Sequence, residues 1–575
     1  MRILGIHSGH NASACLLENG KLRYAIQEER LNREKNSWGF PEGSIRKILH
    51  DVNLRPEDID LVGLSSLYMA PGIHNREQWL KSFETPKSTT GRLKRIIVKN
   101  KFYKQFTIRR RMRPRLESLR RLGFRESQVR VVDHHLSHAA AGYYSTLGKD
   151  PQSRYLVLTL DGGGDGLCAT VNIGAAGKIE VLAKTLDGHS LGNIYSRVTY
   201  CLGFIPWEHE YKLMGMAPYV PKEKSEEISR IFNDYLDLDP QNSLVFKKLI
   251  REDTHEITNR IKRDFFRIRF DWICAGLQEF TEDLMLKWVR ECIRETGVHR
   301  VICSGGVFMN VKANQKILAL PEVEELFVMP SCGDETNSIG AAYYVYARER
   351  IKSNQVIDIE PLGDLYLGNE LTENDINKSV DSFSFSSAVD IEYRDDIERK
   401  VAELLTQGEI VARAKGRMEF GARALGNRSI LADPSNPKVV RIINEMIKCR
   451  DFWMPFCPSV LSERAEEYYI KPKKMHAPYM IISFDSRPEN IERIVAAIHP
   501  YDFTARPQEV DRAWNPDYWR LIKNYEELSG EGIILNTSFN LHGYPIICTA
   551  KDALEVFDKS GLQYLALGNC LIWKT

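Results

Sequence analysis

The sequence lacks any run of about 18 apolar residues, so we expect no helix that spans a membrane. We also expect no secretory leader. The apolar segment 2–6 is followed at once by polar residues, and we expect the mature fold to begin at Met1. The 11 cysteines are scattered, odd in number and without CxxC spacing, which favours buried reduced thiols over disulfides or zinc sites. These absences together indicate a cytoplasmic protein.

A chain of 575 residues is too long for one compact core, which predicts two or three domains. Apolar residues make up 43% and charged residues 27%, the balance of an ordinary soluble globular protein. The polar stretch 354–360 and the Pro-Leu-Gly segment 361–363 resemble a domain boundary. We therefore expect one domain over residues 1–355 and a second over residues 356–575.

The net charge of +2 conceals one strongly basic segment. Residues 87–125 hold 15 Lys and Arg against a single acidic residue, Glu117. One interpretation is a surface for an anionic partner such as RNA or a membrane. The other is a solvated helical insertion around residues 80–126, because apolar side chains recur there at roughly helical spacing. We favour the insertion over a nucleic-acid partner, because a run of charge by itself encodes no specific site.

A unit of three strands joined by two turns occurs twice. The first copy has expected strands at 2–7, 12–17 and 21–27, and the second has them at 155–160, 167–173 and 178–184. Asn19-Gly20, between two apolar runs of the first copy, is a strong hairpin signal. The duplicated unit predicts two similar α/β halves that face each other across a cleft.

Glycine-rich or small loops connect the first two strands of each copy, and the second loop is Asp161–Gly166. Glycine lets backbone N–H groups approach a phosphate closely. A further pair, Gly305-Gly306, separates an expected strand, 300–304, from an expected helix, 307–318. Each turn alone is a weak signal, but together they favour a duplicated actin/hexokinase-like fold that binds ATP. The candidate nucleotide contacts are Gly163, Gly305, Gly306 and Asn310.

Two histidines share one face of an expected helix. The strand-like segment 128–132 leads into an Ala-rich helical sequence on which His134 and His138 are four residues apart. This spacing suits two imidazole ligands of one metal ion, and two unconnected histidines at a strand–helix junction are the alternative. Asp334 is the best candidate for a third ligand. Two histidines and a carboxylate suit iron(II) and leave positions open for substrate oxygens.

The C-terminal half contains residues suited to phosphate. An expected strand, 409–414, leads into 415–429, where arginines, a glutamate and three glycines are concentrated. Guanidinium groups bind phosphate oxygens in pairs and glycines allow a tight loop, although a structural arginine–glutamate network is the alternative. Further candidates lie in the basic cluster 448–451, in the proline-containing loop 504–508 and in the polar turn 536–540 after the expected strand 532–535. The full set is Arg417, Glu419, Arg423, Arg428, Lys448, Arg450, Arg506, Asn536, Ser538 and Asn540.

Across nearly its whole length the chain resembles the O-carbamoyltransferase family, which includes nodulation-factor and antibiotic carbamoyltransferases. The longest and most specific match is Gly416–Leu431, which resembles GRMEFGPRALGNRSIL. The N-terminal His10–Ala14 resembles the family's HDASA, and His134–Ala140 resembles HHLxHAA. Other matches are Ser190–Gly192 with SLG, Lys212–Pro218 with KxMGLAP, Arg506–Gln508 with RPQ and Asn536–Asn540 with NTSFN.

The resemblance implies an N-terminal actin/hexokinase-like (ASKHA) domain similar to threonylcarbamoyl-transferring proteins and a YrdC-like C-terminal α/β domain. It implies that carbamoyl phosphate and ATP, with Mg²⁺, form carbamoyl-adenylate, and that the carbamoyl group then passes to a small hydroxyl-bearing acceptor. Lys448, Arg423 and Arg506 would act on the phosphates. His10 would take the hydroxyl proton, or alternatively orient its loop. The metal would be held by His134, His138 and Asp334; a homodimer is a possible assembly.

The chain departs from the family pattern at three places. Asn11 stands where the motif has Asp, Ala422 replaces a proline, and Glu335-Thr336-Asn337 replaces small residues after Asp334. Three alternative functions remain open at this point. They are a tRNA threonylcarbamoyl-type modification enzyme, a nucleotide-binding regulatory module without catalysis, and a sugar or metabolite kinase. The sequence does not identify the acceptor.

Overall fold

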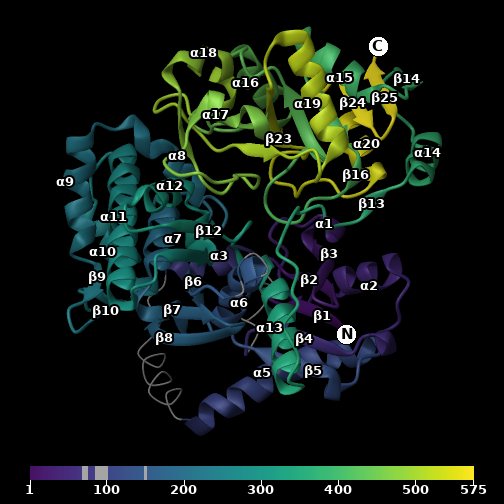
Figure 1. Ribbon diagram of the computed structural model, residues 1–575. Helices are drawn as coiled ribbons and strands as arrows, with labels where there is room; N and C mark the ends of the chain where they lie inside the picture. Colours follow the sequence, from purple (N-terminus) through teal and green to yellow (C-terminus); the bar gives the residue numbers. More distant parts are fainter. Residues whose placement is uncertain (68–75, 85–100, 148–149, 151) are drawn as a thin grey trace. The chain divides into compact units, whose positions relative to one another are not determined.

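The computed structural model describes residues 1–67, 76–84, 101–147, 150 and 152–575 (Figure 1). The chain divides into two compact units. Unit 1 comprises Met1–Glu28 and Asn36–Leu362, and unit 2 comprises Glu29–Lys35 and Gly363–Thr575. A short segment near the N-terminus, including helix α1 (Glu29–Asn32), therefore belongs to unit 2. There the Nη2 atom of Arg30 donates a hydrogen bond to the Gly421 carbonyl at 2.6 Å.

Unit 1 contains two five-stranded sheets with the same strand order. The order is β3-β2-β1-β4-β5 in the first sheet and β8-β7-β6-β11-β12 in the second. In each, three consecutive strands form an antiparallel meander, and two later strands add in parallel beside its first strand. The duplicated unit read from the sequence is therefore matched by a duplicated sheet, and the predicted α/β class is confirmed.

The strands of the first sheet are β1 (Arg2–His7), β2 (Ser13–Glu18), β3 (Lys21–Gln27), β4 (Leu61–Ser65) and β5 (Val129–Val132). Those of the second are β6 (Tyr155–Gly164), β7 (Leu167–Ala175), β8 (Lys178–Leu186), β11 (Arg300–Ser304) and β12 (Glu325–Val328). A separate hairpin consists of β9 (Leu236–Asp239) and β10 (Asn242–Lys248). The helices are α2 (Glu42–Asp51), α3 (Arg76–Glu84), α5 (Lys101–Arg121), α6 (His134–Leu147), α7 (Leu191–Cys201), α8 (Glu210–Met216), α9 (Lys222–Asn233), α10 (Thr258–Asp264), α11 (Phe270–Thr296), α12 (Val311–Ala319) and α13 (Asn337–Lys352).

Helices α6 and α13 connect the two sheets of unit 1 (Figure 1). Helix α6 packs on β6 and β11, helix α13 packs on β1 and β4, and the two helices pack against each other. Their close approach depends on Gly340, because a Cβ atom there would lie 1.8 Å from the Ser137 carbonyl oxygen. This tight contact brings the start of α6 next to the segment that precedes α13.

The helix predicted over 307–318 begins later in the structure. Gly306–Met309 forms a 3-10 turn, and α12 starts at Val311. The cause is Asn310, whose side-chain oxygen accepts a hydrogen bond from the Ala313 amide at 3.1 Å and so caps the helix.

The predicted basic helical insertion is described in part. Residues 101–121 form α5, and residues 76–84 form α3, whereas 87–100 lie outside the described residues. None of the helices in the described ranges combines the length and apolar content that crossing a bilayer requires. The cysteines, all of which lie in the described residues, form no disulfide, and every one except Cys201 and Cys449 is buried.

Unit 2 is built around an eight-stranded sheet in the order β14-β25-β24-β15-β17-β23-β18-β22. Its two faces carry separate apolar cores, with α14, α16 and α20 on one face and α15 and α19 on the other. Alternate residues of one strand enter different cores: Ile430 packs in the first and Leu431 in the second. Unit 2 is thus a layered α/β domain.

The strands of unit 2 are β13 (Glu370–Leu371), β14 (Val389–Tyr393), β15 (Val411–Ala414), β16 (Gly416–Arg417), β17 (Arg428–Ala432), β18 (Cys457–Leu461), β19 (Tyr469–Ile470), β20 (Phe484–Ser486), β21 (Thr504–Ala505), β22 (Gln508–Val510), β23 (Ile533–Ser538), β24 (Tyr564–Leu567) and β25 (Cys570–Lys574). The helices are α14 (Glu373–Ser382), α15 (Ile397–Thr406), α16 (Lys438–Ile443), α17 (Ala465–Tyr468), α18 (Ile491–Ile494), α19 (Pro516–Ser529) and α20 (Ala550–Lys559).

Candidate metal centre and anion-binding network

Four metal-ligating side chains meet in unit 1. His134 and His138 lie one turn apart on α6, Asp161 lies in β6, and Asp334 begins the turn before α13. The Nε2 atoms of His134 and His138 lie 3.5 and 3.3 Å from Asp334 Oδ1, and His134 Nε2 lies 3.3 Å from Asp161 Oδ2. One ligand atom from each residue lies within 4.8 Å of all the others. The group is therefore a compact set of two imidazoles and two carboxylates.

A second layer of hydrogen bonds orients His134. Its Nδ1 atom lies 3.1 Å from Ser66 Oγ, which leaves Nε2 to face the carboxylates. Asp165 Oδ2 accepts from the His134 amide at 2.9 Å and from the Leu67 amide at 2.8 Å. The Asp161 carboxylate is held in the same way, because the Gly306 amide donates to its Oδ1 atom at 3.1 Å. Such outer partners fix the direction of metal ligands.

The electrostatics of the group fit a bound cation. Burial opposes a charged imidazole, but the carboxylates of Asp334 and Asp161 outweigh it and raise the pKa of His134 to about 10. A proton on His134 therefore balances the carboxylates when no metal is bound. Asp334 Oδ1 is buried, and none of the described residues gives it a hydrogen bond. Two nitrogen and two oxygen donors suit iron(II), zinc or manganese.

His10 lies on the loop after β1, beside an aromatic cluster. Its ring centroid is 5.6 Å from those of Trp38 and Trp207, which stack on each other at 5.8 Å. Trp79 contacts Trp207 at 5.2 Å. The connection to the metal ligands runs through His7, whose Nε2 atom lies 3.1 Å from the His10 carbonyl oxygen and 3.8 Å from Asp334 Oδ2. The His10 main chain is thus linked through His7 to Asp334, and its ring lies against an aromatic wall formed by Trp38 and Trp207.

The predicted nucleotide contacts of unit 1 have partners within the protein. The Gly306 amide binds Asp161, and the Gly305 amide donates to the Cys332 carbonyl at 3.0 Å. Asn310 caps α12 and exchanges two 3.0 Å hydrogen bonds with Gln278. Gly163 lies in the same β6 segment as Asp161. Gly305, Gly306 and Asn310 therefore hold this region of unit 1 in shape in the structure.

In unit 2, Lys448 ends a π-turn and its ammonium group is enclosed by the 536–540 segment. The Nζ atom donates to Asn540 Oδ1 at 2.7 Å, to Ser538 Oγ at 3.1 Å and to the Ser538 carbonyl. Burial lowers the pKa of Lys448 well below its usual range, and Arg450 adds to this effect. Arg450 donates to Thr537 Oγ1 at 3.2 Å. The predicted residues Lys448, Arg450, Ser538 and Asn540 therefore form one cluster.

The loop between β16 and β17 is shaped by Glu419 and Arg428, both buried. Glu419 Oε1 accepts from the amides of Leu425 and Arg428 at 2.7 and 3.2 Å. The Arg428 guanidinium donates to backbone carbonyls, among them that of Asn427 at 2.8 Å. Arg417 likewise donates to the Leu367 carbonyl at 2.9 Å. These contacts form a structural arginine–glutamate network, which was the alternative to a phosphate site. The half-buried Arg423 lies on the loop that they support.

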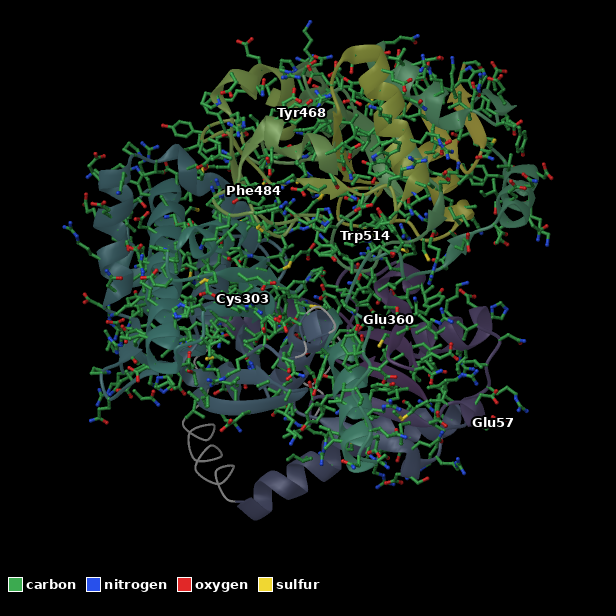
Figure 2. The ribbon with its side chains drawn as sticks, in the orientation of Figure 1. Glu57, Cys303, Glu360, Tyr468, Phe484 and Trp514 are labelled. Atoms are coloured by element: carbon green, nitrogen blue, oxygen red, sulfur yellow. The ribbon has the colours of Figure 1, made fainter. Side chains whose placement is uncertain are left out.

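Adjacent strands bring the remaining predicted residues of unit 2 together. Arg506, between β21 and β22, donates to Cys457 Sγ from Nε at 3.2 Å and from Nη2 at 2.8 Å. Asn536 donates to Ser459 Oγ at 3.0 Å, and Ser459 donates to Gln508 Oε1 at 2.8 Å. A pocket close to Gln508 is walled by aromatic residues that include Trp514, labelled in Figure 2. Strand pairing thus joins motifs that are far apart in the sequence.

Comparison with known proteins identifies the family. The model described as carbamoyltransferase N-terminus matches residues 2–343, and the one described as carbamoyltransferase C-terminus matches residues 402–574. The chain belongs to the carbamoyltransferase family. This membership makes it a carbamoyltransferase family enzyme, which does not fit the alternatives of a kinase or a module without catalysis.

Relatives of this carbamoyltransferase extend over almost its full length. An uncharacterized protein of Methanocaldococcus jannaschii is 31% identical over 582 residues, which cover 100% of this chain and 99% of the relative. The nodulation protein NolNO of Sinorhizobium fredii is 30% identical over 571 residues, 98% of this chain and 79% of the relative. A solved HypF structure from T. kodakarensis is 15% identical, covers 63% of this chain and 49% of that one, and has a TM-score of 0.34, too remote to support an argument.

For this carbamoyltransferase the sequence located most of the residues that the structure brings together, and it missed some. His134, His138 and Asp334 meet as expected, but Asp161 joins them and was not expected as a ligand. The sequence feature that could have indicated Asp161 is a carboxylate at the end of a buried strand, just before a run of glycines. Ser459 and Cys457 were also missed, because their importance depends only on which strands pair with β18.

Proposed function

We propose that this carbamoyltransferase activates carbamate as an adenylate and transfers it to a hydroxyl of a small acceptor. In the first reaction, water hydrolyses carbamoyl phosphate to carbamate and inorganic phosphate, and a carbamate oxygen then displaces pyrophosphate from the α-phosphorus of ATP, with Mg²⁺. In the second, the acceptor oxygen attacks the carbamoyl carbon and AMP leaves. Free carbamate is a poor electrophile, and the AMP leaving group makes the second displacement feasible.

The observation that carries the first reaction is the cluster of basic side chains in unit 2. Lys448 and Arg450 contact the polar segment 536–540, and Arg506 lies two residues before β22, the edge strand of the same sheet. Cationic donors and amide groups in one place bind and neutralise phosphate oxygens. We assign Lys448, Arg423, Arg450 and Arg506 to the phosphates, and Asn536, Ser538 and Asn540 to orienting them. Glu419, Arg417 and Arg428 support the loop that carries Arg423.

The second reaction is assigned to unit 1. A divalent cation held by His134, His138, Asp161 and Asp334 would polarise the carbamoyl oxygen or bind the adenylate phosphate. His10 is suited to accept the hydroxyl proton, since it is half-buried and its main-chain carbonyl is linked through His7 to Asp334 of the metal group. The aromatic wall of Trp38 and Trp207 would position the acceptor and exclude water from His10. Iron(II) is the proposed metal.

The family resemblance and the repeated sheets support an actin/hexokinase-like fold for unit 1, and we propose a YrdC-like type for unit 2. In this assignment the functional domains are residues 1–355 and 356–575. The cytoplasm is the proposed location, and a homodimer is a proposed assembly.

The test uses the full chain with ATP and carbamoyl phosphate but without an acceptor. Pyrophosphate release that requires carbamoyl phosphate is expected, and ADP as the only nucleotide product would overturn the proposal. Arg506→Ala is expected to abolish pyrophosphate release. His138→Ala is expected to preserve it and to block transfer, because His138 belongs to the metal group. Equal loss of the first reaction in both variants would contradict the division of roles between the two units.

A further inference from the structure

Strand β4 ends in an unusual turn. Ser66 adopts a φ of 69°, the left-handed region that residues other than glycine rarely enter. Such a conformation persists only where its surroundings enforce it. Two groups do so here. Arg115 donates from Nη1 to the Ser66 carbonyl at 2.8 Å and from Nη2 to the Ser65 carbonyl at 2.5 Å, and Asp165 accepts from the Leu67 amide at 2.8 Å.

The turn places the Ser66 hydroxyl against a metal ligand. Ser66 Oγ lies 3.1 Å from His134 Nδ1, on the side of the ring opposite the atom that faces Asp161 and Asp334. The partner of one imidazole nitrogen sets which nitrogen is available to a metal and in which direction the ring points. The conformation of Ser66 therefore bears directly on how His134 presents its Nε2 atom.

Arg115 comes from the basic segment, yet it behaves unlike its neighbours. It lies on α5 and is 1% exposed, whereas Arg113 on the same helix is exposed and pairs with Glu117 at 2.8 Å. Burying a guanidinium group is costly unless its donors are used. Two of them reach the carbonyls at the end of β4, and burial lowers the pKa of Arg115 to about 10. The helix is thus fixed to the turn by one buried cation.

We propose that Arg115 and Ser66 are positioning residues for His134, so that the inner face of α5 supports the metal centre. The basic segment then has a structural role in unit 1, and this role does not depend on an anionic partner. The inference rests on the proposed metal centre. Neither residue is a catalytic residue, because Arg115 acts through the turn and Ser66 acts through His134.

The test measures binding of Mn²⁺ and Zn²⁺ to the metal-free full chain by calorimetry, alongside the thermal midpoint. Ser66→Gly is the decisive variant, because glycine adopts the observed φ without strain but removes the hydroxyl. We expect it to keep or raise the thermal midpoint while metal affinity falls about 10- to 100-fold. Arg115→Met is expected to weaken metal binding to a similar degree. Arg113→Met, on the exposed side of the same helix, is the matched control and should bind as the unmodified chain does.

The double variant Ser66→Gly with Arg115→Met separates a shared route from two independent effects. Residues that act through one contact give less than additive losses. The metal affinity of the double variant should therefore be little lower than that of the single variant that binds metal more weakly. Unchanged metal affinity in Ser66→Gly, or additive losses in the double variant, would overturn the proposal. If Arg115→Met proves unstable, Arg115→Lys replaces it, since a point charge cannot bind both carbonyls as a fork. Failure of the unmodified chain to bind either metal would instead overturn the metal centre itself, while pyrophosphate release would still test unit 2.

Discussion

The Nδ2 atom of Asn11 donates to Glu335 Oε2 at 3.4 Å, so two positions at which the chain departs from the family motifs contact each other. Asn11 stands where the HDASA motif has a carboxylate, and Glu335 stands where the family has a small residue. Glu335 is 2% exposed. The loop beside His10 and the segment after Asp334 therefore share one buried carboxylate, which comes from Glu335 in this chain.

Replacing Asn11 by the aspartate of the family motif should therefore, as a single change, destabilise the folded chain. Asn11→Asp would place a second carboxylate beside buried Glu335, and two buried like charges disfavour the ionised pair. We expect a loss of about 1–3 kcal/mol in unfolding free energy near neutral pH, read from thermal or urea unfolding. The double variant Asn11→Asp with Glu335→Gln moves the charge without adding one, and should recover most of the loss. Equal damage in single and double variants would show that the two positions do not share a charge.

The glycine at the end of β6 sets the position of His134. A Cβ atom on Gly164 would lie 2.2 Å from the Cγ and Cδ2 atoms of the His134 ring. Gly164→Ala should therefore displace the imidazole and reduce metal affinity by at least about tenfold. Gly162→Ala in the same segment is the control, because its Cβ would meet only Asn193 Oδ1 at 3.8 Å. Calorimetry with Zn²⁺ measures both, and equal metal affinity in the two variants would contradict the prediction.

Sequence reasoning found the candidate metal ligands that lie in recognisable patterns and missed the one that does not. His134 and His138 are visible because helical spacing puts them on one face, whereas Asp161 joins the group only because β6 ends beside α6. That adjacency depends on the pairing of β6 with β11, a contact between residues far apart in the chain.

The same limit applies in unit 2. The residues of 415–429 left two interpretations open, a phosphate-binding loop and a structural arginine–glutamate network, and the burial of Arg428 against backbone carbonyls fits the second for this residue. The membership of Glu29–Lys35 in unit 2 also had no local signal, because it depends on long-range contacts such as that of Arg33 Nη1 with the Ile546 carbonyl at 2.8 Å.

The position of Arg506 should depend on a buried thiol. Its Nε and Nη2 atoms both donate to Cys457 Sγ, so Cys457→Ala removes the acceptor that fixes the guanidinium plane. We expect pyrophosphate release to slow by about tenfold to a hundredfold, the effect of a misplacement of about 1 Å at a reacting group. Cys570→Ala, a buried cysteine of the same sheet, should leave the rate unchanged. A normal rate in Cys457→Ala would show that Arg506 is held by its other surroundings.

A pH-dependent stability is expected from Glu210, which supports the aromatic wall. Its Oε1 atom accepts the Trp207 amide at 2.7 Å, in a turn where Trp207 has a φ of 63°. Burial raises the pKa of Glu210 from 4.5 to about 7. The folded chain therefore keeps a proton that the unfolded chain loses between these values, and this contribution to stability falls as pH rises from about 4.5 to about 7.

Glu210→Gln should remove that dependence, because an amide oxygen still accepts the Trp207 amide but does not ionise. The variant should match the unmodified chain below pH 4.5 and become more stable than it by about 1–2 kcal/mol above pH 7, less than the full shift because the solvent-accessible surface of Glu210 leaves it only half-buried. Thermal midpoints of both chains between pH 4 and about pH 8 measure the difference. Parallel curves over this whole interval would mean that Glu210 ionises as freely in the folded chain as in the unfolded one.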